Sequence, residues 1–147
     1  MKAGELERYV ALAARDVAEW GGILILLDAD DDCPATLGPG LETRALAARG
    51  DRKIAVVVAK REFEAWFLAG ASSLRGQRGF PGDLQAPTNP EEIRGAKEWL
   101  AARMSGASYS PTVDQPALAA ILDLEATRAS APSFDKWCRE IGDLLRR

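Results

Sequence analysis

The sequence contains no histidine among its 147 residues. Histidine is the usual general base near neutral pH, the partner of serine or cysteine in nucleophilic catalysis, and a common zinc ligand. Its absence excludes those catalytic pairs and the common zinc sites. Any chemistry must therefore come from carboxylates, lysine, arginine, tyrosine or a bound metal ion.

Cysteine, net positive charge and long apolar runs are also scarce. Cys33 and Cys138 are too few for a disulfide framework and are not spaced as a zinc site. The formal net charge of -3 excludes nucleic-acid binding through bulk charge, so any such contact needs a local basic patch. No apolar stretch approaches the roughly 20 residues that span a bilayer, and the start lacks the apolar core of a signal peptide. We therefore expect a cytoplasmic protein without a membrane segment.

Two apolar runs, residues 23–27 and 53–59, predict buried parallel strands. Apolar residues at helical spacing predict a helix over residues 5–19 before the first strand. A loop over 33–40 and a short helix over 41–48 are expected between the strands. The fold class is α/β, with a small parallel sheet of Rossmann-like type and helices on its faces. Two strands alone are too few for a covered parallel sheet.

The second half of the chain is expected to be mainly helical. Aromatic residues at helical spacing predict a helix over 61–68, and glycine and proline predict an irregular loop over 75–90 that acts as a lid. Further helices are expected over 91–104, 117–125 and 133–145. The length of the chain favours one domain covering residues 1–147.

The first predicted strand runs directly into an acidic cluster, Asp28, Asp30, Asp31 and Asp32. The carboxyl ends of strands in open α/β sheets hold ligands and ions. In an extended segment Asp28 and Asp30 would point the same way, and hard oxygen ligands suit magnesium, manganese or calcium. The alternative is a solvated acidic loop that caps the following helix.

A second acidic pair, Glu62 and Glu64, follows the second predicted strand and is expected at the same sheet edge. Residues two apart on a helix do not face together, which favours one ligand, Glu64, over both. The alternative is that both are surface charges on an amphipathic helix. Lys60 and Arg61 would neutralise a phosphate near the metal, or else form salt bridges with the acidic cluster.

Several motifs together resemble the prokaryotic family called domain of unknown function 4276, and the resemblance covers nearly the whole chain. The motifs are LDADDDCP at 27–34, KREFEAWFLA at 60–69, GAKEWL at 95–100, YSPTVDQP at 109–116, and Ser133-Phe134. The family looks like a relative of the Toprim fold of topoisomerases, primases and overcoming-lysogenisation-type nucleases. Some of its members occur with phage-defence ATPases.

The resemblance implies a magnesium (or manganese) site with Asp28 and Asp30 as an Asp-x-Asp pair. Glu64, with Glu62, would match a later acidic position of nuclease-type relatives, so Asp28, Asp30 and Glu64 are the implied catalytic residues. The implied function is metal-dependent processing of nucleic-acid phosphodiester bonds, as a nuclease in phage defence. The alternative is a catalytically inactive partner or regulatory module of a defence ATPase.

The chain departs from the family at its amino-terminal end. Family members usually begin with a strand ending in Glu-Gly, followed by a helix and another strand. In Toprim proteins that Glu acts as general base or metal partner. The missing strand would be expected to pair with residues 23–27. We therefore expect either a gene start placed too late or a trimmed form that completes its sheet by dimerising. In both cases an apolar strand edge is exposed and favours self-association.

Overall fold

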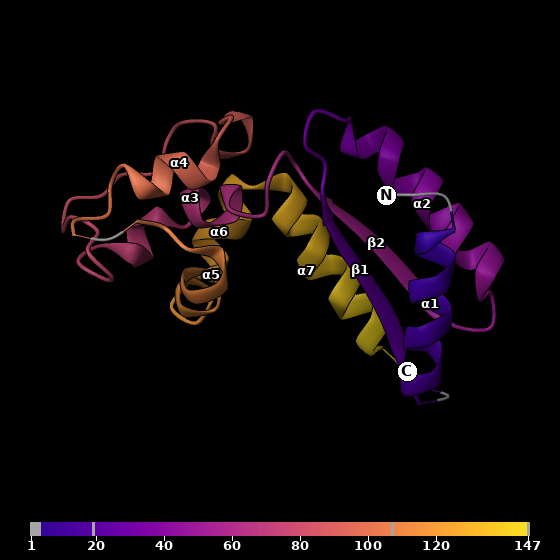
Figure 1. Ribbon diagram of the computed structural model, residues 1–147. Coiled ribbons are helices and arrows are strands. Elements are labelled where there is room, and N and C mark those ends of the chain that lie inside the picture. Colours follow the sequence, from indigo (N-terminus) through magenta and orange to yellow (C-terminus); the bar gives the residue numbers. More distant parts are fainter. Residues whose placement is uncertain (1–3, 19, 107, 147) are drawn as a thin grey trace. The chain divides into compact units, whose positions relative to one another are not determined.

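The computed structural model describes residues 4–18, 20–106 and 108–146. The chain forms two compact units (Figure 1). The first comprises Met1–Ala59 together with Lys136–Arg147, and the second comprises Lys60–Asp135. The interpretation of the whole chain as one domain stays a prediction.

The first unit contains a parallel sheet, so the α/β class is confirmed. Strand β1 (Gly22–Asp28) pairs with β2 (Lys53–Ala59), and Asp28 lies opposite Ala59 at the carboxyl end. Both strands fall where the apolar runs predicted them. The described residues form no third strand, so the sheet has two strands and β1 is an edge.

Helices cover the two faces of this sheet (Figure 1). Helices α1 (Glu5–Asp16) and α2 (Pro34–Ala48) lie on one face, and α7 (Pro132–Leu145) lies on the other. The core under α1 and α2 contains apolar residues from both helices and alternate residues of both strands. These include Leu6, Val10, Leu41, Ala45, Ile23, Ile54, Val56 and Val58. On the opposite face α7 approaches so closely that a Cβ at Gly22 would lie 2.7 Å from Leu144 Cδ2.

Helix α2 begins at Pro34, so the expected loop over 33–40 is wrong. Glycine and proline suggested a loop, but Pro34 occupies the first turn, where a missing amide is tolerated. Pro39 lies inside the helix. Thr43 Oγ1 donates a hydrogen bond to the Pro39 carbonyl at 2.9 Å.

The second unit is helical, as the sequence predicts for this part of the chain. Its elements are α3 (Ala65–Ala69), the 3-10 turns η1 (Ala71–Leu74) and η2 (Pro90–Glu92), α4 (Ala96–Ala101), α5 (Pro111–Ala119), α6 (Leu124–Ser130) and the start of α7. Its core is built mainly from buried apolar residues, among them Phe67, Leu68, Leu74, Phe80, Leu100 and Leu118. No helix in the described part of the chain is long and apolar enough to cross a membrane.

Several helix boundaries differ from the sequence-based expectation. The helix expected over 91–104 is reduced to α4, because Gly95 takes a left-handed conformation with φ of 69° and interrupts it. The helix expected over 117–125 is divided between α5 and α6, and Asp123 caps α6 by accepting a hydrogen bond from the Ala126 amide at 3.0 Å. The last helix begins one residue before its predicted start.

Candidate functional site

Asp28 is the last residue of β1, and its position at the carboxyl end of a parallel strand is confirmed. The next residue, Ala29, is buried and donates its amide to the Ala59 carbonyl at 2.9 Å. The Asp28 side chain is half-buried, whereas Asp30 and its two acidic neighbours are exposed. Asp28 is therefore the only one of the four acidic residues whose position is fixed by the sheet itself.

The backbone does not continue as a strand to Asp30. Asp30 adopts a positive φ of 50°, and the Asp32 amide closes a turn onto the Ala29 carbonyl at 2.8 Å. The expectation that Asp28 and Asp30 share one side of an extended segment is therefore wrong. Aspartate tolerates this left-handed conformation better than most residues. That both residues bind a metal ion stays a prediction.

The structure also bears on the alternative interpretation, in which the acidic cluster caps the following helix. The N-cap of α2 is Cys33, whose side chain makes no capping hydrogen bond. The acidic cluster therefore precedes the capping position instead of occupying it.

Glu62 and Glu64 lie in a turn and not in the predicted helix. Helix α3 begins only at Ala65, after Arg61 has taken a positive φ of 62°. As a result both carboxylates reach Lys97, whose Nζ is 3.1 Å from Glu62 Oε2 and 3.4 Å from Glu64 Oε2. The helical argument that separated these two residues was wrong, because the segment that carries them is not helical.

Glu64 is fully buried, with 0% of its surface exposed. Its Oε1 accepts hydrogen bonds from the Tyr109 hydroxyl at 3.0 Å and from Gln115 Nε2 at 2.8 Å. Its Oε2 accepts no hydrogen bond, although Lys97 lies within ion-pair distance. Burying a carboxylate is costly unless charge and hydrogen bonds compensate, and here the compensation is incomplete.

Two of these partners are held by the start of α5. Asp114 is buried and accepts a hydrogen bond from the Ser110 amide at 2.7 Å. Its other oxygen accepts hydrogen bonds from Arg78 Nε at 2.9 Å and Nη2 at 2.6 Å. The carboxylate of Asp114 therefore fixes the segment that carries Tyr109 and Gln115.

The charges of the cluster shift the pKa values of its neighbours. Burial and the negative charge of Glu64 both raise the pKa of Tyr109 well above its ordinary value. Burial acts to lower the pKa of Lys97, but the hydrogen bond to Glu62 and the charges of Glu64 and Glu62 outweigh it. The pKa of Lys97 is therefore raised, and the ammonium form is favoured at neutral pH.

Lys60 and Arg61 both pair with Glu92. Lys60 Nζ makes a hydrogen-bonded ion pair with it, and Arg61 Nη2 lies 3.8 Å from Glu92 Oε2. The hydrogen bond from Lys60 lowers the pKa of Glu92. Contact of either residue with phosphate stays a prediction.

Sequence reasoning missed Lys97, Tyr109 and Gln115 as parts of one cluster with Glu64. The signal was present, because all three lie in motifs that carry the family resemblance. Spacing could not reveal their contact, since Tyr109 and Gln115 are 45 and 51 residues from Glu64.

A metal site needs several suitable side chains arranged around one ion. Within each unit, the described residues include no group of three acidic or cysteine side chains arranged to hold a metal ion. The second unit supplies two carboxylates, Glu62 and Glu64, that converge on one cation, Lys97.

Together these features define an α/β protein with a carboxylate at the end of a parallel strand and a buried glutamate cluster in its helical unit. The chain belongs to the family described as Domain of unknown function (DUF4276), whose model matches residues 6–142. No curated protein and no solved structure matches the chain significantly.

Proposed function

We propose that this protein is a magnesium- or manganese-dependent domain that processes phosphodiester bonds of nucleic acid, in phage defence. Asp28, Asp30, Glu62 and Glu64 supply the oxygen ligands, with Asp28, Asp30 and Glu64 essential for activity. The observation that carries the proposal is the fully buried Glu64, whose Oε2 accepts no hydrogen bond. A buried carboxylate oxygen that makes no hydrogen bond is suited to binding a cation, and here the ammonium group of Lys97 already lies 3.4 Å from it.

The donor set fits a hard divalent cation. All four groups are carboxylates, and the sequence offers no imidazole that would favour zinc. Asp28 ends β1, opposite the last residue of β2, and Glu62 and Glu64 follow that residue closely in the sequence. Ligands gathered at the carboxyl ends of parallel strands are the rule in open α/β folds.

The chain's own residues have distinct tasks in this proposal. Tyr109 and Gln115 hold Glu64 Oε1, which leaves Oε2 for the ion. Lys97 balances the charge of Glu62 and Glu64 before the ion binds. When substrate binds, Lys60 and Arg61 release Glu92 and pair with a phosphate of the substrate instead. When bound, the metal ion polarises a phosphoryl oxygen and lowers the pKa of a bound water.

The second candidate is a catalytically inactive partner or regulatory module of a defence ATPase. It is favoured by the ammonium group of Lys97, which already gives Glu62 and Glu64 a cation. In that case the cluster stabilises the helical unit and requires no metal ion.

The test is cleavage of supercoiled plasmid and of labelled single-stranded DNA and RNA with magnesium or manganese. We expect cleavage that chelator abolishes and that Asp28→Asn and Glu64→Gln each reduce by at least about a hundredfold. Asp32→Asn is the matched control, because it removes an exposed carboxylate of the same acidic cluster. Its activity should equal that of the unmodified chain.

The two candidates give different results in this assay. Cleavage that survives both Asp28→Asn and Glu64→Gln contradicts the enzymatic proposal. A folded chain that cleaves none of the substrates, but binds an ATPase without added metal, supports the partner module.

A further inference from the structure

The ammonium group of Lys97 serves two carboxylates, and it serves them unequally. Lys97 Nζ donates a hydrogen bond to Glu62 Oε2 at 3.1 Å. It lies 3.4 Å from Glu64 Oε2, which is enclosed and accepts no hydrogen bond. We call the point between these two oxygens the cation position. The ammonium group occupies it without satisfying both oxygens.

The carboxylates at the cation position are held more firmly than the cation. Glu64 is fully buried, and its other oxygen is fixed by Tyr109 and Gln115. The side chain of Glu62 is 19% exposed, whereas that of Lys97 is 40% exposed. A lysine ammonium is strongly hydrated and sits on a flexible four-carbon stem. It can therefore move into solvent while both carboxylates stay in place.

This movement requires no change in the backbone of α4. Ala96 and Leu100, on either side of Lys97 in the helix, are fully buried in the core of the second unit. The core therefore fixes the helix, and rotation about the side-chain bonds of Lys97 is sufficient to empty the cation position.

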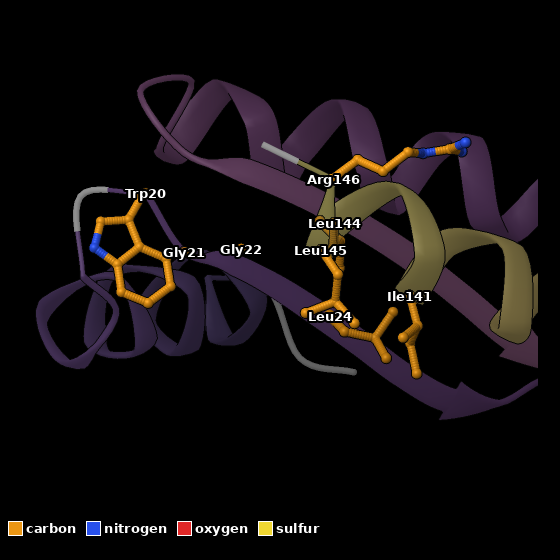
Figure 2. A pocket seen from close by; sticks show the side chains of 8 residues that line it. All are labelled: Trp20, Gly21, Gly22, Leu24, Ile141, Leu144, Leu145 and Arg146. Atoms are coloured by element: carbon orange, nitrogen blue, oxygen red, sulfur yellow. The ribbon is translucent and has the colours of Figure 1, made fainter.

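An apolar hollow of the first unit offers no comparable position. Figure 2 shows this hollow, of about 340 Å³, with Leu24 of β1 beside Ile141 and Leu144 of α7. The described residues that line it include no acidic side chain, and Arg146 supplies their only charge. A cation would find no carboxylate ligand there, in contrast to the position beside Glu62 and Glu64.

We propose that Lys97 is an internal competitor for the metal ion, whose ammonium group must leave the cation position before a divalent ion binds to Glu62 and Glu64. Two cations cannot share the position, because like charges at such short distance repel. A magnesium ion carries twice the charge and binds carboxylate oxygens at about 2.1 Å, so it can satisfy both oxygens directly. Lys97 therefore sets the metal affinity of the site.

This role of Lys97 rests on the proposed metal site, because Glu62 and Glu64 are ligands of that site. It does not require cleavage of nucleic acid. A chain whose ammonium group left the position too rarely would bind no metal ion, which is the behaviour of the inactive partner module. The balance between the ammonium group and the ion therefore regulates the site.

An internal competitor differs from a purely structural lysine in the sign of one effect. In both roles, Lys97→Met should destabilise the metal-free chain, because Glu62 and Glu64 lose their cation. A structural lysine gives the metal ion no advantage when it is removed. A competitor does, so the same substitution should strengthen metal binding.

The test is manganese titration of the full chain and of Lys97→Met, which removes the charge and keeps an unbranched side chain. Lys97→Met should bind manganese at least about tenfold more tightly than the unmodified chain. Arg128→Met is the matched control, because it removes one positive charge of the second unit whose ion pair is with Asp135. The manganese affinity of Arg128→Met should equal that of the unmodified chain.

Stability supplies a second measurement on the same proteins. Manganese should raise the melting temperature of Lys97→Met by more than that of the unmodified chain, because it replaces the lost cation. Lys97→Arg keeps a cation opposite both carboxylates and should show no gain in manganese affinity.

A third measurement needs no variant, so it stands even if Lys97→Met does not fold. Acetic anhydride labels the unprotonated amines of lysine, and mass spectrometry reads each site. Magnesium should raise the labelling rate of Lys97 at least about threefold, because the amine is released from two carboxylates that favour its charged form. Lys136 bonds to the Val56 carbonyl and to Glu140, and its labelling rate should not change.

The outcomes separate this role of Lys97 from the proposed function. Manganese binding by Lys97→Met that is no tighter than that of the unmodified chain overturns it, as does labelling of Lys97 that magnesium leaves unchanged. Cleavage of nucleic acid by the unmodified chain together with either result leaves the proposed function intact. Tighter binding by Lys97→Met without any cleavage supports the internal competitor and contradicts the proposed function alone.

Discussion

A fully buried carboxylate such as Glu64 needs compensation, and three residues provide part of it. Tyr109 and Gln115 donate to one oxygen, while Lys97 places its charge near the other. Side chains buried for packing alone are usually apolar, so a charged group at this position costs stability. This cost is the physical reason for proposing a functional role for Glu64.

Removing the charge of Glu64 should lower the pKa of Tyr109. Burial and the Glu64 charge both raise it, so Glu64→Gln removes the second cause and leaves the first. Without the nearby negative charge the phenolate is less disfavoured, and Tyr109 should ionise at lower pH. Ultraviolet titration of the unmodified chain and the variant measures this shift, with Tyr109→Phe identifying the signal. An unchanged titration would contradict an effect of Glu64 on Tyr109.

The sequence pointed to candidate acidic residues but not to their contacts. The absence of histidine and the two acidic pairs directed attention to Asp28, Asp30, Glu62 and Glu64. The contact of Glu64 with Tyr109 and Gln115 depends on how distant segments fold together, which local spacing does not encode.

At the scale of elements, α2 shows how composition can mislead. Its first turn contains Pro34, and Pro39 stands in its interior, yet the helix runs from Pro34 to Ala48. Packing of Leu41 and Ala45 into the core supplies stability that local propensity lacks. Tertiary contacts therefore overrule the local preference for a loop.

Replacing Pro39 with alanine should stabilise the protein. Inside the helix proline lacks the amide that would bond to the carbonyl four residues earlier, and its ring crowds that carbonyl. We expect Pro39→Ala to raise the free energy of unfolding by about 1–3 kcal/mol in urea denaturation. Pro34→Ala is the matched control and should not stabilise, because proline suits the first turn. Equal gains from both would contradict this explanation.

The strands could be predicted because their signal is local. Residues 53–59 form an unbroken apolar, β-branched run after Lys53, and the observed β2 has these bounds. The helices of the second unit were harder, because Gly95 and the Asp123 cap divide segments whose apolar spacing looked continuous. The ends of these helices depend on the backbone conformation of single residues. A hydrophobic spacing pattern over many residues does not reveal such a conformation.

At the scale of the whole molecule, the proposed metal-dependent function rests on four carboxylates that the sequence singled out, Asp28, Asp30, Glu62 and Glu64. The family match over residues 6–142 supports the sequence-based resemblance but assigns no activity.

Divalent-metal binding is the central claim, and manganese titration followed by electron paramagnetic resonance tests it most directly. The free-ion signal should fall as the unmodified chain binds manganese, and magnesium should restore it by competition. Asp28→Asn and Glu64→Gln should each weaken binding at least about tenfold, whereas Asp32→Asn should not. No binding at millimolar manganese, or equal binding by all four proteins, would contradict the claim.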